Sequence, residues 1–328
     1  MMSNLDPDPH ETISGGRAGV ATEPVRELLE GRDVVLGGTR GMSVVRTLPN
    51  KERRMVGAWC FVDSFGPKSV NGGPGMRVAP HPHTGLQTVT WLVQGEVLHR
   101  DSLANQQLIH PGQLNLMTAG RGISHAEESP TGHGPVLQGV QLWVALPDEH
   151  RGVAPFFDHH RDLPDLVDGG VRVRVLMGEL GGALAGQGSP ARAYSPLVGA
   201  EVAFDRDAET RLGLEPDFEY AAVTLSGAVE VDGVLLSPGS LLYLGCGRVD
   251  LALRAEEPGR LLLLGGEPFD EEIIMWWNFI GRSHDEIVRA REDWMTGRGF
   301  GEVRGYDGEP LPAPAMPTST LKPRGRLR

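Results

Sequence analysis

Two short patterns in the first half of the chain combine residue types that bind transition metals. His81 and His83 are separated by one residue, and His125 and Glu127 are separated in the same way. Residues two apart on a β-strand point to the same face, so each pair could present both side chains to one interior. Three imidazoles and one carboxylate that met there would bind a first-row transition metal and leave coordination positions open for a small molecule.

The types of ligand restrict the metal. Neutral imidazoles and a carboxylate suit iron, which we expect, with manganese, nickel, copper or zinc as alternatives. The chain has two cysteines, Cys60 and Cys246, and neither is near the two pairs, which argues against zinc in a structural role. A single His-x-His pair is more often a turn or surface feature than a metal site, so the prediction depends on both pairs together.

The segments around these pairs have the pattern of strands joined by tight turns. Residues 86–93 (LQTVTWLV) are rich in β-branched and aromatic side chains, and a Gln-Gly turn follows them. The prolines on either side of His81 favour extended geometry and cannot donate to a sheet ladder, which suits a strand at an edge or a barrel mouth. Residues 136–145 (VLQGVQLWVA) complete the unit as a long alternating strand.

The second half of the chain repeats this plan. Short strands alternate with turns rich in Gly, Pro and Ser over residues 220–225, 228–231, 234–236 and 241–244. Such spacing predicts a barrel or sandwich rather than alternating strands and helices. We therefore expect an all-β chain with two tandem barrels and a few short helices, including one near the C-terminus over residues 285–294. Ser283 can cap this helix, and Asp285 and Glu286 are favourable in its first turn.

The histidines are distributed unevenly between the two halves. Nine of the eleven fall within residues 81–160, and none lies within residues 161–283. The second barrel therefore cannot build the same site, and we expect it to be structural. Of the other histidines, His99 and His110 could lie near the site, but ordinary hairpin positions are expected for both. His159 and His160 are expected in a polar surface loop.

The expected division of the chain has four parts. Residues 1–31 are polar and predict a flexible N-terminal tail, although residues 24–29 have a short helical pattern. The N-terminal barrel with the metal site should span residues 32–150, and the C-terminal barrel without one should span residues 151–300. The Gly- and Pro-rich residues 301–328 predict a loose C-terminal arm.

The charge balance and the cysteine count bear on partners and location. With 31 basic and 43 acidic residues, the formal net charge is −12, which argues against direct nucleic-acid binding because that requires a basic surface. Two cysteines in 328 residues are typical of buried thiols in a reducing cytoplasm. No apolar run resembles a signal peptide or reaches the ~20 residues of a membrane span, so we expect a cytoplasmic protein without membrane contact.

Longer stretches around the two pairs resemble the pirin family of the cupins. The stretches that carry this resemblance are HPHTGLQTVT at 81–90, HRDS at 99–102, MTAGRGISHAE at 117–127 and GGEPF at 265–269. The resemblance implies a bicupin fold, with two tandem cupin-type barrels and a metal only in the first. It also implies that His81, His83, His125 and Glu127 are the iron ligands.

The sequence departs from the family pattern near the predicted centre. Thr84 stands where the family usually has a basic residue, and Gln87 stands where it usually has glutamate. Asn115 and Leu116 stand where Gln-Trp is common. None of these residues is a predicted ligand, but groups around a metal tune ligand basicity and reactivity, so the departures bear on the substrate.

The resemblance implies two alternative functions, because family members include quercetin dioxygenases and an iron-dependent transcriptional co-regulator. In the first, a flavonol-like (quercetin-type) or other phenolic or enol substrate binds at the metal, and Glu127 acts as both ligand and base. In the second, the protein is a non-enzymatic redox sensor whose iron oxidation state alters its contact with a regulatory protein partner. The sequence favours the enzyme weakly, because an open metal position inside a barrel is suited to catalysis.

Overall fold

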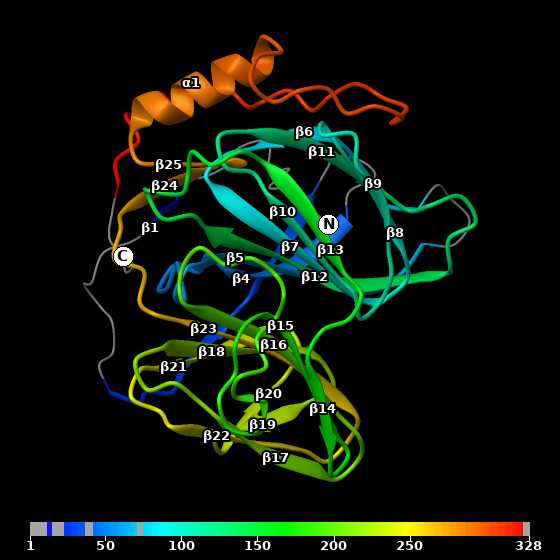
Figure 1. Cartoon of the computed structure of the whole chain (residues 1–328), viewed down its shortest axis with the longest axis vertical. Helices are drawn as coiled ribbons and strands as arrows, with labels where there is room; N and C mark the ends of the chain where they lie inside the picture. Colours follow the sequence, from blue (N-terminus) through cyan, green and yellow to red (C-terminus); the bar gives the residue numbers. More distant parts are fainter. Residues whose placement is uncertain (1–11, 15–22, 37–41, 71–74, 324–328) are drawn as a thin grey trace.

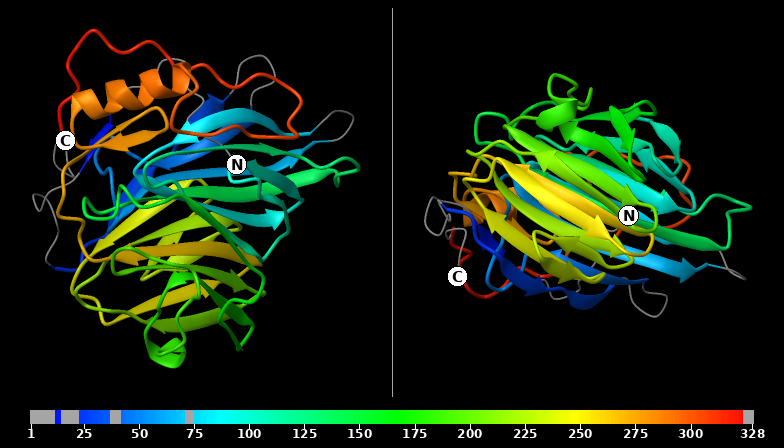
Figure 2. Two further views of the ribbon diagram at one scale, coloured as in Figure 1. Left: turned by 45° about the horizontal axis from the view of Figure 1, so that its top comes forward. Right: turned by 90° about the horizontal axis from the view of Figure 1, so that it is seen from below.

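The computed structural model describes residues 12–14, 23–36, 42–70 and 75–323, and over this part the chain is mainly β-structure. Two barrels lie one above the other, and α1 (His284–Met295) lies against the first of them, away from the second (Figures 1 and 2). The predicted all-β class with two tandem barrels is therefore confirmed. No helix in the described residues is long and apolar enough to cross a membrane.

The first barrel consists of two facing antiparallel sheets. Its larger sheet has the strand order β13-β10-β7-β12-β5-β4-β3, and its smaller sheet has the order β6-β11-β8-β9. The strands of the larger sheet are β3 (Arg32–Leu36), β4 (Met42–Leu48), β5 (Trp59–Ser69), β7 (Leu86–Gln94), β10 (Leu114–Thr118), β12 (Val136–Ala145) and β13 (Phe156–His160). Those of the smaller sheet are β6 (Arg77–His83), β8 (Val97–Asp101), β9 (Gln106–Ile109) and β11 (Ile123–Glu128).

The second barrel repeats this layout of seven strands facing four. The larger sheet has the order β14-β15-β16-β23-β18-β21-β2, and the smaller has the order β17-β22-β19-β20. The larger sheet contains β14 (Asp165–Asp168), β15 (Val171–Gly178), β16 (Leu197–Phe204), β23 (Gly259–Gly266), β18 (Glu219–Ser226), β21 (Ser240–Gly245) and β2 (Glu27–Glu30). The smaller contains β17 (Ala208–Gly213), β22 (Asp250–Ala255), β19 (Val229–Val231) and β20 (Val234–Leu236), and one 3-10 turn, η2, spans Gly182–Leu184.

A third, small sheet and the helix lie against the first barrel. The sheet contains β1 (Thr12–Ser14), β24 (Ile273–Trp276) and β25 (Phe279–Gly281). The helix α1 begins where the sequence predicts, because the Ser283 side chain accepts a hydrogen bond from the Glu286 backbone N–H and caps the first turn. Acidic residues in that turn complement the positive end of the helix dipole.

The helical pattern expected over residues 24–29 is wrong. Glu27–Glu30 forms strand β2, which pairs with β21 and buries Leu29 in the core. Six residues are too few for a stable helix in water, so pairing with an open sheet edge and burial of one leucine decide the conformation. Strands also cross the expected boundaries: β2 belongs to the second barrel, β13 pairs with β10 of the first, and β1 lies within the expected N-terminal tail.

Buried hydrogen bonds join the two barrels. The Trp59 indole N–H lies 3.1 Å from both the Val198 and the Gly265 carbonyl oxygens. Glu219, fully buried on β18, accepts hydrogen bonds from the Gly57 backbone N–H at 2.6 Å and from the Tyr243 hydroxyl at 2.7 Å. An apolar cluster with members from both barrels surrounds these contacts, so each barrel supports the other.

We expect Glu219→Leu to lower the free energy of unfolding by about 2–5 kcal/mol, because it leaves two buried donors without their acceptor. Tyr243→Phe, which removes one donor from the same carboxylate, should cost less, about 1–3 kcal/mol. Urea unfolding followed by tryptophan fluorescence would measure both. Equal stability of Glu219→Leu and wild type would show that the carboxylate does not support the interface.

Candidate metal centre

The two ligand pairs predicted from the sequence lie side by side on the smaller sheet of the first barrel. Strands β6 and β11 are antiparallel neighbours, with His81 opposite His125 and His83 opposite Ile123. The register shifts between His125 and Glu127, which lies opposite Val78. Each ligand-x-ligand pair is therefore on a strand, as its spacing predicts, and both pairs face the interior of the barrel.

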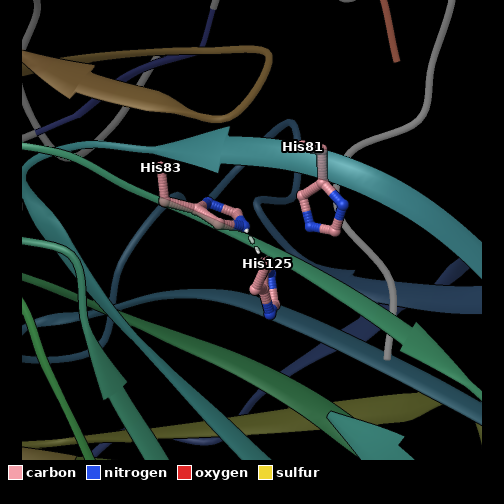
Figure 3. A group of neighbouring side chains, drawn as sticks. All are labelled: His81, His83 and His125. Carbon is pink, nitrogen blue, oxygen red and sulfur yellow. Dashed lines mark hydrogen bonds between the residues drawn. The ribbon is translucent and has the colours of Figure 1, made fainter. Parts of the chain in front are cut away.

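The three imidazole rings turn toward one another inside the barrel (Figure 3). The ring centroid of His125 lies 4.3 Å from that of His81 and 5.0 Å from that of His83. The Nε2 atoms of His83 and His125 are 3.1 Å apart. Two nitrogens bound at right angles to one metal, at about 2.1 Å each, would be about 3 Å apart, so this spacing fits shared coordination.

Glu127 lies on the other side of His125. Its Oε1 is 4.0 Å from the His125 Nδ1. Possible metal-ligating atoms of Glu127, His99 and His125 all lie within 4.8 Å of one another. His81, His83 and His125 form a separate group whose donor atoms all lie within 4.8 Å of one another. The structure therefore brings the predicted residues into two metal-capable groups that share His125.

Burial leaves unpaired polar atoms at this position. The side chains of His81, His83, His125 and Glu127 are at most 2% exposed. His81 Nε2 and Glu127 Oε2 have no hydrogen-bond partner, and an unsatisfied buried polar atom costs about 1–3 kcal/mol. A cation among these atoms would remove that cost, so the donor set fits a bound metal.

Hydrogen bonds orient two of the imidazoles for ligation through Nε2. His81 Nδ1 lies 2.8 Å from the Ala79 carbonyl oxygen, which can only accept, so Nδ1 carries the proton and Nε2 has a free lone pair. For His125, Nδ1 lies 3.4 Å from His99 Nδ1, and His99 Nε2 lies 3.3 Å from the Asp101 carboxylate. A carboxylate that accepts from His99 leaves His99 Nδ1 to accept from His125, so His125 Nε2 is also free.

The electrostatics favour the ligating form of each histidine. Burial lowers the pKa of His81 to about 3 and lowers the pKa values of His83 and His125 well below 6.5, with the neighbouring histidines adding to the shift. Burial also raises the pKa of Glu127. The imidazoles are therefore neutral at physiological pH, which is the form that binds metals.

The position of His99 differs from the expectation. Instead of an ordinary hairpin position, it is buried beside His125 on β8 and stacks on the Phe157 ring at 4.4 Å. The period-two alternation of Val97, His99 and Asp101 is a signal for a common face. Sequence alone could not show that this face meets β11, because the register that places His99 opposite Glu127 depends on tertiary pairing.

The segment expected as a loose arm holds the outer face of the two ligand strands. The Leu311 backbone N–H donates to the Pro80 carbonyl oxygen at 2.8 Å. The Ser124 hydroxyl lies 3.2 Å from the carbonyl oxygens of Phe300 and Gly301. Leu321, near the end of the described residues, is 2% exposed. Residues 300–321 are therefore packed onto the barrel without regular secondary structure, because their polar backbone groups find partners in β6, β11 and α1.

Comparison with known proteins identifies the family. Residues 40–144 match the family described as Pirin, and residues 199–301 match the Pirin C-terminal cupin domain. A protein of Pseudomonas aeruginosa named as a candidate quercetin 2,3-dioxygenase is 48% identical over 296 residues, covering 90% of this chain and 92% of that one. The chain belongs to the pirin family. The bicupin expectation from the sequence is therefore confirmed.

Other pirin relatives extend the similarity to solved structures. A pirin-like protein of Caulobacter vibrioides is 39% identical over 263 residues, covering 78% of this chain and 88% of that one. A crystal structure of a quercetin 2,3-dioxygenase from Acinetobacter baumannii has a TM-score of 0.85 and 40% identity, covering 90% of this chain and 98% of that one. YhhW from Escherichia coli, at 18% identity and a TM-score of 0.60, shares the fold.

The depressed histidine pKa values predict a loss of stability in acid for the metal-free pirin chain. Below pH 6.5 the histidines of the unfolded chain become protonated, whereas the buried imidazoles of the folded chain stay neutral. The free energy of unfolding therefore falls as the pH falls toward the pKa values of the folded state. Each histidine contributes at most about 1.4 kcal/mol per pH unit to the slope of the unfolding free energy against pH. The raised pKa of Glu127 contributes with the opposite sign, because the folded chain then binds the proton more tightly than the unfolded chain.

Urea unfolding of chelator-treated protein at pH 7, 6 and 5 would measure this slope. We expect His81→Leu to flatten it by up to about 1.4 kcal/mol per pH unit, because one buried titrating group is removed. An identical slope in wild type and variant would contradict the assignment of neutral, buried imidazoles.

Proposed function

We propose that this pirin is a metal-dependent dioxygenase that acts on a flavonol-like (quercetin-type) or other phenolic or enol substrate. The observation that carries the proposal is the convergence of three buried imidazoles with an unpaired carboxylate oxygen nearby, inside the first barrel. The names of the relatives at 48% and 40% identity support it.

In this proposal the Nε2 atoms of His81, His83 and His125 and the carboxylate of Glu127 hold the metal, which we propose is iron. A bound divalent metal would orient a deprotonated substrate oxygen and stabilise its charge. The second barrel holds no metal in this proposal, because its interior cluster consists of aliphatic and aromatic side chains. Cys60 and Cys246 are unpaired and buried, which supports our proposal of a cytoplasmic location.

Glu127 is the residue that we propose to take the proton of the substrate hydroxyl. One of its carboxylate oxygens has no partner, and burial raises its pKa, which makes it a stronger base than an exposed glutamate. Aromatic side chains beside His83 would bind a flat substrate. Trp143 meets the His83 ring edge to face at 5.2 Å, and Phe61 stacks on Trp143 at 4.1 Å.

Aerobic turnover of quercetin tests the proposal. Chelator-treated protein would be loaded separately with iron, manganese, nickel, copper or zinc, and the loss of quercetin absorbance would be followed together with oxygen consumption. We expect loss of absorbance with at least one metal and none with the metal-free protein. Equal rates with and without metal, for quercetin and for a panel of simpler phenols, would reject the proposal.

Removal of a proposed ligand should remove the metal. We expect His81→Ala, His83→Ala and His125→Ala to contain clearly less than one metal per chain after loading, by elemental analysis. His99→Phe keeps the ligands but removes the acceptor for His125 Nδ1, so it should weaken metal affinity by about 10–100-fold. His110→Phe is the matched control, because the His110 side chain is partly exposed and paired with Glu96. Equal metal affinity in His99→Phe and His110→Phe would contradict the orienting role of His99.

Glu127→Gln separates proton transfer from metal binding. Three imidazoles remain in this variant, so we expect it to retain most of its metal. Turnover should fall by about 10²–10⁴-fold, the usual contribution of a positioned general base. Rates per bound metal within two-fold of wild type, by the same absorbance assay, would show that Glu127 is not the base.

A further inference from the structure

A second polar pair lies inside the first barrel, apart from the proposed metal ligands. Asn115 on β10 is opposite His159 on β13, and His159 Nδ1 lies 2.8 Å from Asn115 Oδ1. Asn115 is 2% exposed. The expected surface loop at His159 is thus a strand that continues the larger sheet of the barrel.

The strand register shows that this pair faces the interior. On β13, Phe157 stacks on His99, which lies beside His125 in the barrel. Alternate residues of a strand share a face, so His159 points to the same side as Phe157. Asn115 shares that side because it pairs with His159, as Met117 pairs with Phe157. His159 is two residues after Phe157 on the same strand, so the pair lies about 7 Å from the Phe157–His99 contact along β13.

The pair has two hydrogen-bonding atoms that nothing satisfies. Asn115 Nδ2 and His159 Nε2 are buried and have no partner. Burial and the positive charge of Arg161 lower the pKa of His159, so its ring is neutral at physiological pH. If His159 Nδ1 donates to the amide oxygen, the pair is left with the Asn115 NH2 group as a donor and His159 Nε2 as an acceptor. If the amide is turned over, the donor and the acceptor exchange places, and one of each remains.

Two other groups of polar side chains on the same interior are paired. The Thr90 hydroxyl donates to Gln141 Oε1 at 3.1 Å, and the Gln141 amide donates to the Val89 carbonyl oxygen at the same distance. Arg46 and Asp63 form a bidentate ion pair, in which each of two guanidinium nitrogens lies 2.8 Å from a carboxylate oxygen. The unpaired donor and acceptor of the Asn115–His159 pair therefore lie beside polar side chains that have partners.

The pair lies at the edge of the larger sheet of the first barrel. All five residues of β13 are half-buried, and β13 is the edge strand of its sheet, whereas the proposed ligands are at most 2% exposed. Phe157 of β13 contacts His99, which lies beside His125, so a substrate that extends from the metal toward β13 would have its far end near this pair.

We propose that Asn115 and His159 bind a ring hydroxyl of an aromatic substrate and select for substrates that carry one at the end away from the metal. This inference rests on the proposed function for the orientation of the substrate. A hydroxyl group both accepts and donates, so it satisfies the free donor and the free acceptor together. An unsubstituted ring would leave both buried atoms unpaired, which disfavours its binding.

The test compares quercetin with 3-hydroxyflavone, which keeps the enol hydroxyl and the adjoining carbonyl but lacks the other ring hydroxyls. Dissociation constants would be measured without oxygen by calorimetry on metal-loaded protein. We expect wild type to bind quercetin at least about ten-fold more tightly than 3-hydroxyflavone, since two hydrogen bonds are gained. Equal affinities, or binding of neither compound, would overturn the proposal.

Two variants test whether the preference for quercetin over 3-hydroxyflavone depends on Asn115 and His159. In Asn115→Leu and in the double variant Asn115→Leu/His159→Phe, the ratio of the two dissociation constants should fall to within about two-fold of unity. The double variant removes both unpaired atoms and their mutual hydrogen bond, so its thermal midpoint should be at least that of wild type. His160→Leu, one residue along on the opposite face of β13, is the control and should keep the wild-type ratio.

The outcomes separate a binding role from a structural one. A double variant that unfolds at lower temperature yet keeps the wild-type ratio would overturn the proposal in favour of a purely structural pair. The measurement is independent of turnover. If no metal supports oxidation of quercetin but the ratio collapses in Asn115→Leu and not in His160→Leu, the dioxygenase proposal fails and the hydroxyl site stands.

Discussion

The antiparallel pairing of β6 with β11 is the constraint on which the candidate metal centre depends. It sets His81 opposite His125 and places four ligand-type side chains in one interior. A shift of either strand by one residue would turn its side chains to the opposite face. Contacts on the outer face oppose such a shift, because Pro80 and Ser124 bind the backbone of residues 300–311. A segment far away in the sequence thus supports the geometry of the centre.

The two barrels have the same arrangement of strands, but their interiors differ in chemical character. In the second barrel, aliphatic and aromatic side chains fill the space between the sheets. In the first, the interior holds histidines, carboxylates, amides and an arginine, whose desolvation is unfavourable unless each group is paired. Shared apolar packing and the Glu219 and Trp59 hydrogen bonds attach this polar barrel to the apolar one. This attachment lets the first barrel carry unpaired atoms at the centre and at the Asn115–His159 pair.

Hydrogen bonds around the centre matter as much as the proposed ligands. The contacts from Asp101 through His99 to His125 determine which ring nitrogen is free, and the Ala79 carbonyl does the same for His81. Burial keeps the rings neutral, because it disfavours the charged imidazolium. The chain therefore presents lone pairs rather than protons to the space between the rings, which suits a cation there.

Local features of the sequence were enough for a large part of this structure. The period-two spacing of His81 with His83 and of His125 with Glu127 predicts a common face, because the pleat of a strand depends only on adjacent residues. The helix near the C-terminus followed from its Ser283 cap and acidic first turn. Tertiary structure decided the rest. His99 and His159 face the interior only because of their registers with β11 and β10, and Glu27–Glu30 is a strand because β21, more than 200 residues later, offers an open edge. Such pairings depend on backbone partners distant in the chain, which residue spacing within one segment cannot specify.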